Sequence, residues 1–171
     1  MKMPTEMHEK FMRLALEQAE TALRNGEFPV GCVIISGGEV VATGGRMNSG
    51  VDLCELDHAE IVALRNLQRT RPEIDLSSVT VYSTMEPCLM CYATLIVNNV
   101  HRLVYGYEDV MGGGTNLPLA QLSPLYASFA MEITKDILRR ESLSLFRQFF
   151  TSGENDYLKD SLLAQYTLQQ K

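Results

Sequence analysis

The spacing of apolar side chains at the start of the chain predicts an amphipathic helix. Apolar residues recur at helical intervals there, so that one face of the helix is available for a core. These positions are Met7, Phe11, Ala15, Ala19 and Ala22. Thr5, directly after Pro4, is expected to cap the helix. Asn25-Gly26 is expected to end it.

Shorter apolar runs, rich in β-branched residues, predict strands. The run 30–35 indicates a buried strand. Residues 36–39 have a turn sequence and are expected to join this strand to a second one, 40–43, in a hairpin. Three further strands are expected at 79–83, 103–105 and 131–134. Residues 44–56 have neither period and are expected to form a loop.

Between and after these strands the pattern returns to helical spacing. Asp57 is expected to cap a helix whose apolar face includes Ile61 and Leu64, and Pro72 marks its end. Pro87 suits the first turn of a helix to about Val97, and a helix between two strands indicates a parallel crossover. Further helices are expected at 138–150 and 156–169. The sequence therefore predicts a single α/β domain over residues 1–171, a three-layer α/β/α sandwich with an additional C-terminal helix.

Composition and charge restrict the class of protein. The content of 46% hydrophobic and 21% charged residues is ordinary for a soluble domain. No apolar run is long enough to cross a bilayer, and the polar stretch 1–10 argues against a signal peptide, so we expect a cytoplasmic protein without a membrane partner. The net charge of −6 disfavours general affinity for polyanions such as RNA.

The chemistry of the chain is concentrated in His58-Ala59-Glu60 and Pro87-Cys88-Leu89-Met90-Cys91. One imidazole and two thiolates can hold a zinc ion and leave its fourth position open to water. Cys88 and Cys91 are three residues apart, so a helix places their sulfurs on one face. The N-terminus of that helix favours the thiolate form that binds metal. This spacing is the signature of the zinc nucleobase deaminases.

Three alternatives remain open at this stage. A lone Cys-x-x-Cys can be a redox pair. Asp57 and Glu60 also fit a capping box, in which Glu60 would bond the Asp57 amide instead of serving a metal site. Cys54, four residues before His58, could complete a closed and catalytically inert Cys3His site. The open site is favoured because a closed one would leave Glu60 without a water to activate.

The open site predicts a hydrolytic mechanism. Glu60 takes a proton from the activated water, and the oxygen attacks the ring carbon that bears the exocyclic amine. Glu60 then returns protons to the ring nitrogen and to the departing ammonia. The Cys88 backbone N–H, at a helix N-terminus, is expected to orient or stabilise the oxygen.

The zinc motif and its surroundings resemble the tRNA adenosine deaminase branch of the cytidine deaminase superfamily, which also contains guanine deaminases. The resemblance covers roughly residues 8 to 150. Its matching stretches are Phe28–Val33, His58–Arg65, Met85–Cys91, Val104–Gly106 and Gly112-Gly113. The resemblance implies a five-stranded mixed sheet and a homodimer. It also implies one zinc per chain on His58, Cys88 and Cys91, with Glu60 as proton shuttle.

The resemblance also implies a base pocket, and several departures bear on its substrate. Val30, Ala59 and Met85 are expected to line the pocket. Where the family usually has an asparagine that contacts the nucleotide, alignment places Arg46, with Asn48 two residues later as the alternative.

The remaining departures lie in three other segments. The loop 53–57 is more acidic than the family pattern, Ser128-Phe129-Ala130 replaces Asn-His-Arg, and the C-terminal helix lacks basic character. These differences favour a free nucleobase or nucleoside, with a tRNA adenosine as the alternative substrate. A non-catalytic zinc subunit is a third hypothesis, which the presence of Glu60 disfavours.

Overall fold

The structure is a computed structural model that describes residues 4–170. The ends of the predicted domain, residues 1–3 and 171, lie outside the described part. The first helix, α1 (Thr5–Arg24), begins one position earlier than expected. Pro4 is its N-cap, and the carbonyl of Pro4 accepts the amides of Met7 and His8. The Thr5 side chain makes no capping bond, so the prediction of a Thr5 cap is wrong.

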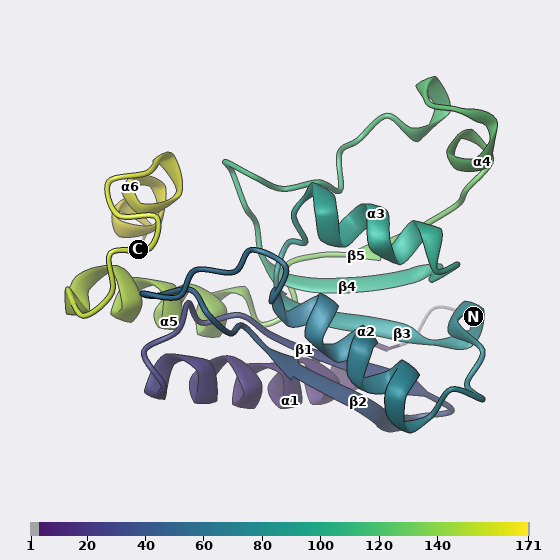
Figure 1. The fold of residues 1–171 in the computed structure, drawn as a ribbon, viewed down its shortest axis with the longest axis horizontal. Coiled ribbons are helices and arrows are strands. Elements are labelled where there is room, and N and C mark those ends of the chain that lie inside the picture. The colour runs from purple at the N-terminus through teal and green to yellow at the C-terminus, as the bar shows by residue number, and fades with distance from the viewer. Residues whose placement is uncertain (1–3, 171) are drawn as a thin grey trace.

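A five-stranded sheet forms the middle layer, and its order is β2-β1-β3-β4-β5 (Figure 1). Its strands are β1 (Gly31–Ser36), β2 (Glu39–Gly45), β3 (Thr80–Met85), β4 (Arg102–Tyr107) and β5 (Glu132–Thr134). β1 pairs antiparallel with β2 and β3, whereas β3, β4 and β5 run parallel. The expectation of a mixed sheet is confirmed.

Helices cover both faces of this sheet (Figure 1). α2 (Ala59–Thr70) and α3 (Leu89–Val97) lie on one face, and α1 and α5 (Arg139–Ser152) lie on the other. Two apolar clusters result, because alternate strand residues point to opposite faces. Val33 and Ile35 pack with α1, whereas Cys32 and Ile34 pack in the cluster that contains most of the buried apolar residues of α2 and α3. The three-layer sandwich is confirmed.

The final helix is shorter than predicted. α6 (Leu162–Gln169) replaces the expected helix over 156–169, and Ser161 caps it by accepting the amide of Ala164. Gly153, the C-cap of α5, has a φ of 68°. Leu158 and Asp160 have positive φ angles of 56° and 60°, so a helix cannot continue through them. The apolar period of 156–169 therefore belongs partly to a folded loop.

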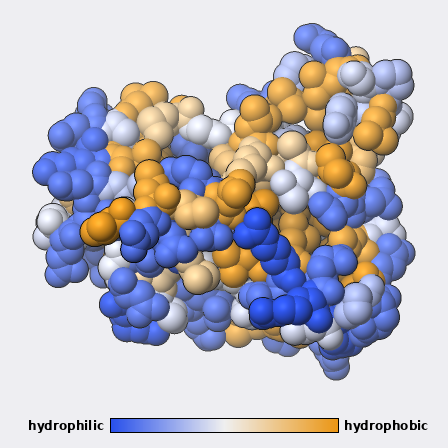
Figure 2. All heavy atoms as spheres, in the orientation of Figure 1, coloured by the Kyte–Doolittle hydropathy of each residue, from blue (hydrophilic) through white to orange (hydrophobic). Residues whose placement is uncertain are grey.

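Between β4 and β5 the chain leaves the sheet as a projecting arm, residues 109–131 (Figure 1). The arm carries two short helices that were not predicted, η2 (Leu119–Gln121) and α4 (Pro124–Ala127). A third, η1 (Leu76–Ser78), precedes β3. Leu122 and Leu125 of the arm are exposed apolar side chains. Hydrophobic surface, in orange, is visible on the arm in Figure 2. No helix within residues 4–170 is long and apolar enough to cross a membrane.

Candidate active site

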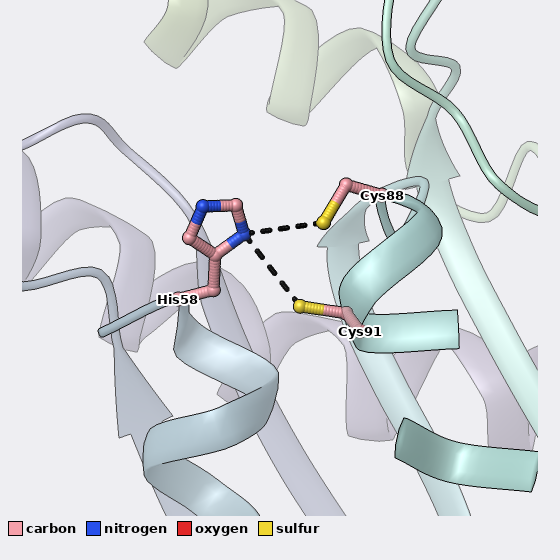
Figure 3. Close-up of side chains that lie close together, drawn as sticks. All are labelled: His58, Cys88 and Cys91. Atoms are coloured by element: carbon pink, nitrogen blue, oxygen red, sulfur yellow. Dashed lines mark hydrogen bonds between the residues drawn. The ribbon is translucent and has the colours of Figure 1, made fainter. Parts of the chain in front are cut away.

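The N-termini of α2 and α3 bring the predicted metal ligands together. His58 is the N-cap of α2 and Cys88 is the N-cap of α3, so each helix begins after a ligand and not at Asp57 or Pro87 as expected. Cys91 lies in the first turn of α3. His58 Nδ1 lies 3.5 Å from Cys88 Sγ and 3.6 Å from Cys91 Sγ (Figure 3).

These separations fit zinc. With zinc–sulfur and zinc–nitrogen bonds of about 2.3 and 2.1 Å, a tetrahedral ion separates its nitrogen and sulfur ligands by about 3.6 Å. The three ligand atoms lie within 4.8 Å of one another, and this group does not include Cys54. The geometry therefore disagrees with the closed Cys3His alternative, because Cys54 is too far away to complete it. Three ligands leave one tetrahedral position open.

Hydrogen bonds among Cys88, Cys91 and His58 set the pKa values of these three side chains. A hydrogen bond with Cys91, followed by one with His58, lowers the pKa of Cys88 to about 4 despite its burial. The same hydrogen bond with Cys88, followed by burial, raises the pKa of Cys91. Burial alone would lower the pKa of His58, but hydrogen bonds with Cys88 and Glu55 outweigh burial and raise it to about 9. Metal binding would displace these protons.

Glu60 stands beside the ligands and is buried, with 3% of its surface exposed. Its Oε1 accepts a hydrogen bond from Ser83 Oγ at 2.9 Å, and its Oε2 lies 3.4 Å from Cys91 Sγ. Burial raises the pKa of this carboxyl, which favours a group that both accepts and returns protons. No side chain caps α2, so the capping-box alternative for Asp57 and Glu60 is wrong.

A pocket that is partly open to solvent adjoins these groups. Four of the five residues expected to contact substrate line it. These are Val30, Arg46, Ala59 and Met85. Asn48 is not among the lining residues, because its Nδ2 is bound to Asp57 Oδ2 at 2.7 Å. The expectation that Asn48 could substitute for the family asparagine disagrees with this placement.

Arg46 is buried, with 3% of its surface exposed, so its guanidinium must find its partners inside the protein. Its Nη1 donates to the carbonyl oxygens of Met47 and Cys54, at 2.6 and 2.8 Å. Its Nη2 donates to Glu55 Oε2 at 3.0 Å. Arg46 Nε has no hydrogen-bond partner in the described part of the chain. The side chain thus holds the loop before His58 from inside while forming part of the pocket wall.

Sequence reasoning missed several residues of the pocket. Glu86 and Asp109 follow β3 and β4, and the carboxyl ends of parallel strands are where α/β folds place their sites, so this signal could have found them. Tyr157, Leu158 and Leu163 reach the pocket from the C-terminal part of the chain. No local motif marks these three, because only the path of the chain after α5 brings them there.

Three metal ligands that leave one coordination position open, next to a buried carboxylate, are typical of a metal-dependent hydrolase. Comparison of the sequence with known protein families shows which family this is. Residues 5–107 match the family model described as the cytidine and deoxycytidylate deaminase zinc-binding region. The chain belongs to this family, which makes it a zinc-type deaminase and a hydrolytic enzyme.

Relatives and solved structures agree with this assignment. The tRNA-specific adenosine deaminase of Haemophilus influenzae is 33% identical over 149 residues, or 87% of this chain and 86% of the relative. That of Agrobacterium fabrum is 33% identical over 146 residues, or 85% and 95%. A solved structure from a study of A-to-I editing by tRNA:A34 deaminases has 29% identity and a TM-score of 0.64, and the match covers 74% of this chain and 96% of that one. A guanine deaminase from Nitrosomonas europaea, at 24% identity and a TM-score of 0.66 over 82% and 83%, shares the fold.

Proposed function

We propose that this enzyme deaminates adenosine in tRNA, with water as co-substrate and with inosine and ammonia as products. The buried Glu60 beside the three-ligand set carries the reaction type. The choice of adenosine in tRNA is supported by relatives of that name at 33% identity over most of the chain. It replaces the expectation of a free nucleobase or nucleoside, which the comparisons do not support.

In the proposed site, His58, Cys88 and Cys91 hold one zinc ion per chain. Zinc bound there would act as a Lewis acid that makes water a strong nucleophile near neutral pH. Glu60 takes a proton from that water and delivers it to the ring nitrogen beside the amine-bearing carbon. Glu60 then takes the remaining proton of the attacking oxygen and passes it to the amine, which leaves as ammonia while the carbon keeps that oxygen. Ser83 Oγ holds the carboxylate in place throughout.

The remaining pocket residues receive the base. Val30, Ala59 and Met85 supply apolar walls, and Arg46 supplies a cation at the wall that leads to the loop 47–57. The Cys88 backbone N–H, at the start of α3, is proposed to orient the attacking oxygen. These proposed roles add base-binding residues of the pocket to the zinc ligands and the proton shuttle.

One observation favours a second candidate, the deamination of a free purine base. One wall of the pocket is formed by Tyr157, Leu158 and Leu163, which lie far from the zinc motif in the sequence. A polymer must bring its target base past this wall, whereas a free base need not carry flanking nucleotides. The net charge of −6 points the same way, although charge summed over the chain does not describe the surface around one pocket.

The deciding experiment measures ammonia release and base identity with the zinc-loaded enzyme. The substrates are an adenosine-containing tRNA anticodon stem-loop, the same stem-loop with guanosine at the target position, and free adenine, guanine and cytosine with their nucleosides. We expect inosine in the adenosine stem-loop alone. Turnover of a free base with no inosine in the stem-loop would replace the proposal by the second candidate.

The homodimer expected from the resemblance remains a prediction. The arm 109–131 supports it, because Leu122 and Leu125 leave apolar surface exposed there. Size-exclusion chromatography with light scattering should give twice the chain mass of 19.1 kDa. A monomer across the micromolar range would contradict it.

A further inference from the structure

One carboxylate oxygen joins the metal site to the C-terminal part of the chain. Glu55 Oε2 contacts three groups at 3.0 Å: Nε2 of His58, Nη2 of Arg46 and the hydroxyl of Tyr157. His58 is a proposed zinc ligand, whereas Tyr157 belongs to the C-terminal segment, which we define as residues 153–170. The proposed mechanism uses neither Glu55 nor Tyr157.

The contact with His58 has the geometry of a partner that orients a metal ligand. His58 directs Nδ1 to the two sulfurs, so Nε2 is the nitrogen left to carry a proton when Nδ1 binds metal (Figure 3). That N–H then donates to Glu55 Oε2. A carboxylate in this position fixes the orientation of the imidazole and makes its other nitrogen a stronger ligand.

The C-terminal segment is built to present Tyr157 to the same oxygen. Asn155 Nδ2 donates to the Gly26 carbonyl at 2.8 Å, which anchors the segment to the turn after α1. Asn155 Oδ1 accepts the amide of Tyr157 at 2.8 Å, which turns the chain inward. The Tyr157 ring packs edge-on against Phe28 at 5.3 Å and lies 5.3 Å from the Arg46 guanidinium.

We propose that Glu55 is the positioning residue of the zinc ligand His58, and that Tyr157 docks the C-terminal segment onto the same carboxylate. Zinc binding and docking of residues 153–170 therefore stabilise each other. Zinc requires the orientation of His58 that Glu55 supports, and Tyr157 helps to hold Glu55 in that orientation. Such coupling is reciprocal, because each event must favour the other by the same free energy. The proposal rests on the zinc site of the proposed function and is independent of the substrate.

The first test measures zinc affinity by competition with a chromophoric chelator. We expect Glu55→Ala to weaken zinc binding by about 10- to 100-fold. We expect Tyr157→Phe, which removes only the hydroxyl, to weaken it by about 2- to 10-fold. Glu55→Gln keeps an acceptor for the imidazole and should fall between Glu55→Ala and the wild type. Because both side chains act through one oxygen, the double variant should bind zinc about as tightly as Glu55→Ala alone.

Matched controls separate this contact from general loosening. Glu73 is an exposed glutamate paired with Arg71, and Glu73→Ala should leave zinc affinity unchanged. Tyr166 lies in the same C-terminal segment, but its hydroxyl donates to Glu108 at 2.6 Å. Tyr166→Phe removes a bond of the same segment without touching Glu55, so it should weaken zinc binding less than Tyr157→Phe does. An equal loss in Tyr166→Phe and Tyr157→Phe would overturn the proposal, as would wild-type affinity in Glu55→Ala or Tyr157→Phe.

The second test measures the coupling from the other side. Hydrogen exchange of residues 153–170 should slow when zinc is added to the wild type, and this zinc effect should be lost in Glu55→Ala. Exchange that does not respond to zinc in the wild type would overturn the coupling. Neither test uses a substrate. A failure of the proposed function would appear as an inactive zinc-loaded enzyme with these affinities unaltered.

Discussion

Gly44 of β2 sets the distance between the sheet and the helix that carries His58 and Glu60. A β-carbon at Gly44 would lie 2.4 Å from the carbonyl oxygen of Ala59 and 2.5 Å from the amide nitrogen of Ala63. Ordinary van der Waals contact for a β-carbon begins at 3.4 Å. Both neighbours are backbone atoms of α2, so no side-chain rotation can relieve the contact. Gly44→Ala should therefore push the first turn of α2 away from the sheet by about 1 Å, the difference between 3.4 and 2.4 Å.

The displacement should reduce both stability and activity. Overpacking of this kind costs about 1–3 kcal/mol of unfolding free energy. For a chain of this size that corresponds to a fall in Tm of about 2–12 °C. Because the displaced turn carries the proposed metal ligand and the proposed proton shuttle, a shift of about 1 Å should lower kcat/KM by about 100-fold.

The assay compares Gly44→Ala with its neighbour Gly45→Ala. A β-carbon at Gly45 would point to α1 and meet Gln18 O at 3.4 Å and the Ala22 β-carbon at 3.9 Å, which is ordinary contact. Both variants add one methyl group to the same strand and differ in the direction in which it points. The difference between them in Tm, from differential scanning calorimetry, and in kcat/KM, from steady-state kinetics, therefore reports the effect of that direction. If the two variants had the same Tm and the same activity, the packing argument for Gly44 would be refuted.

Three further predictions follow from side chains of the site and its surroundings. Glu60→Gln should lower kcat by at least about 100-fold while metal analysis still finds one zinc per chain, and residual activity near that of the wild type would contradict its role as proton shuttle. Cys54→Ser should keep full zinc content, because Cys54 lies outside the ligand group; loss of zinc would support the closed site. Burial alone would raise the pKa of Glu108, but hydrogen bonds from Arg139 and Tyr166 outweigh it and lower that pKa. The Glu108 contacts should therefore stabilise the fold fully at pH values above the ordinary carboxyl pKa of 4.5. We expect Glu108→Gln to have a lower Tm than the wild type at pH 7. The difference in Tm should disappear as the pH falls through the lowered pKa of Glu108.

The parts of the fold that the sequence predicts are those in which the signal is local. The β1–β2 hairpin and the α3 crossover follow from apolar runs next to turn residues, and both occur. Helix starts were displaced by one or two positions, because Asp57 and Pro87 satisfy the general preferences for a cap and a first turn. The structure instead uses His58 and Cys88 as N-caps, with no capping bond from either side chain.

The residues of the candidate site also divide into those that a local sequence signal predicts and those that it does not. His58, Glu60, Cys88 and Cys91 are found from spacing, because residues at the start of two helices need only the sheet to bring those starts together. The walls contributed by Tyr157 and Leu158 were missed because their positions depend on a loop with left-handed residues at 158 and 160. A hydrophobic period extends over that loop, and periodicity alone does not register a positive φ.

The departures from the family pattern around Arg46, in the loop 53–57 and in the C-terminal segment are not independent. Arg46 is buried, so its charge needs acceptors, and the carbonyl of Cys54 and the carboxylate of Glu55 provide them. Glu55 in turn is half exposed, and its Oε2 also accepts a hydrogen bond from the Tyr157 hydroxyl. Removing one member therefore takes a hydrogen-bond partner from at least one of the others. An Arg46→Asn exchange in this chain should therefore not restore the family's arrangement, because Glu55 and Tyr157 would keep their places around a guanidinium that is no longer there.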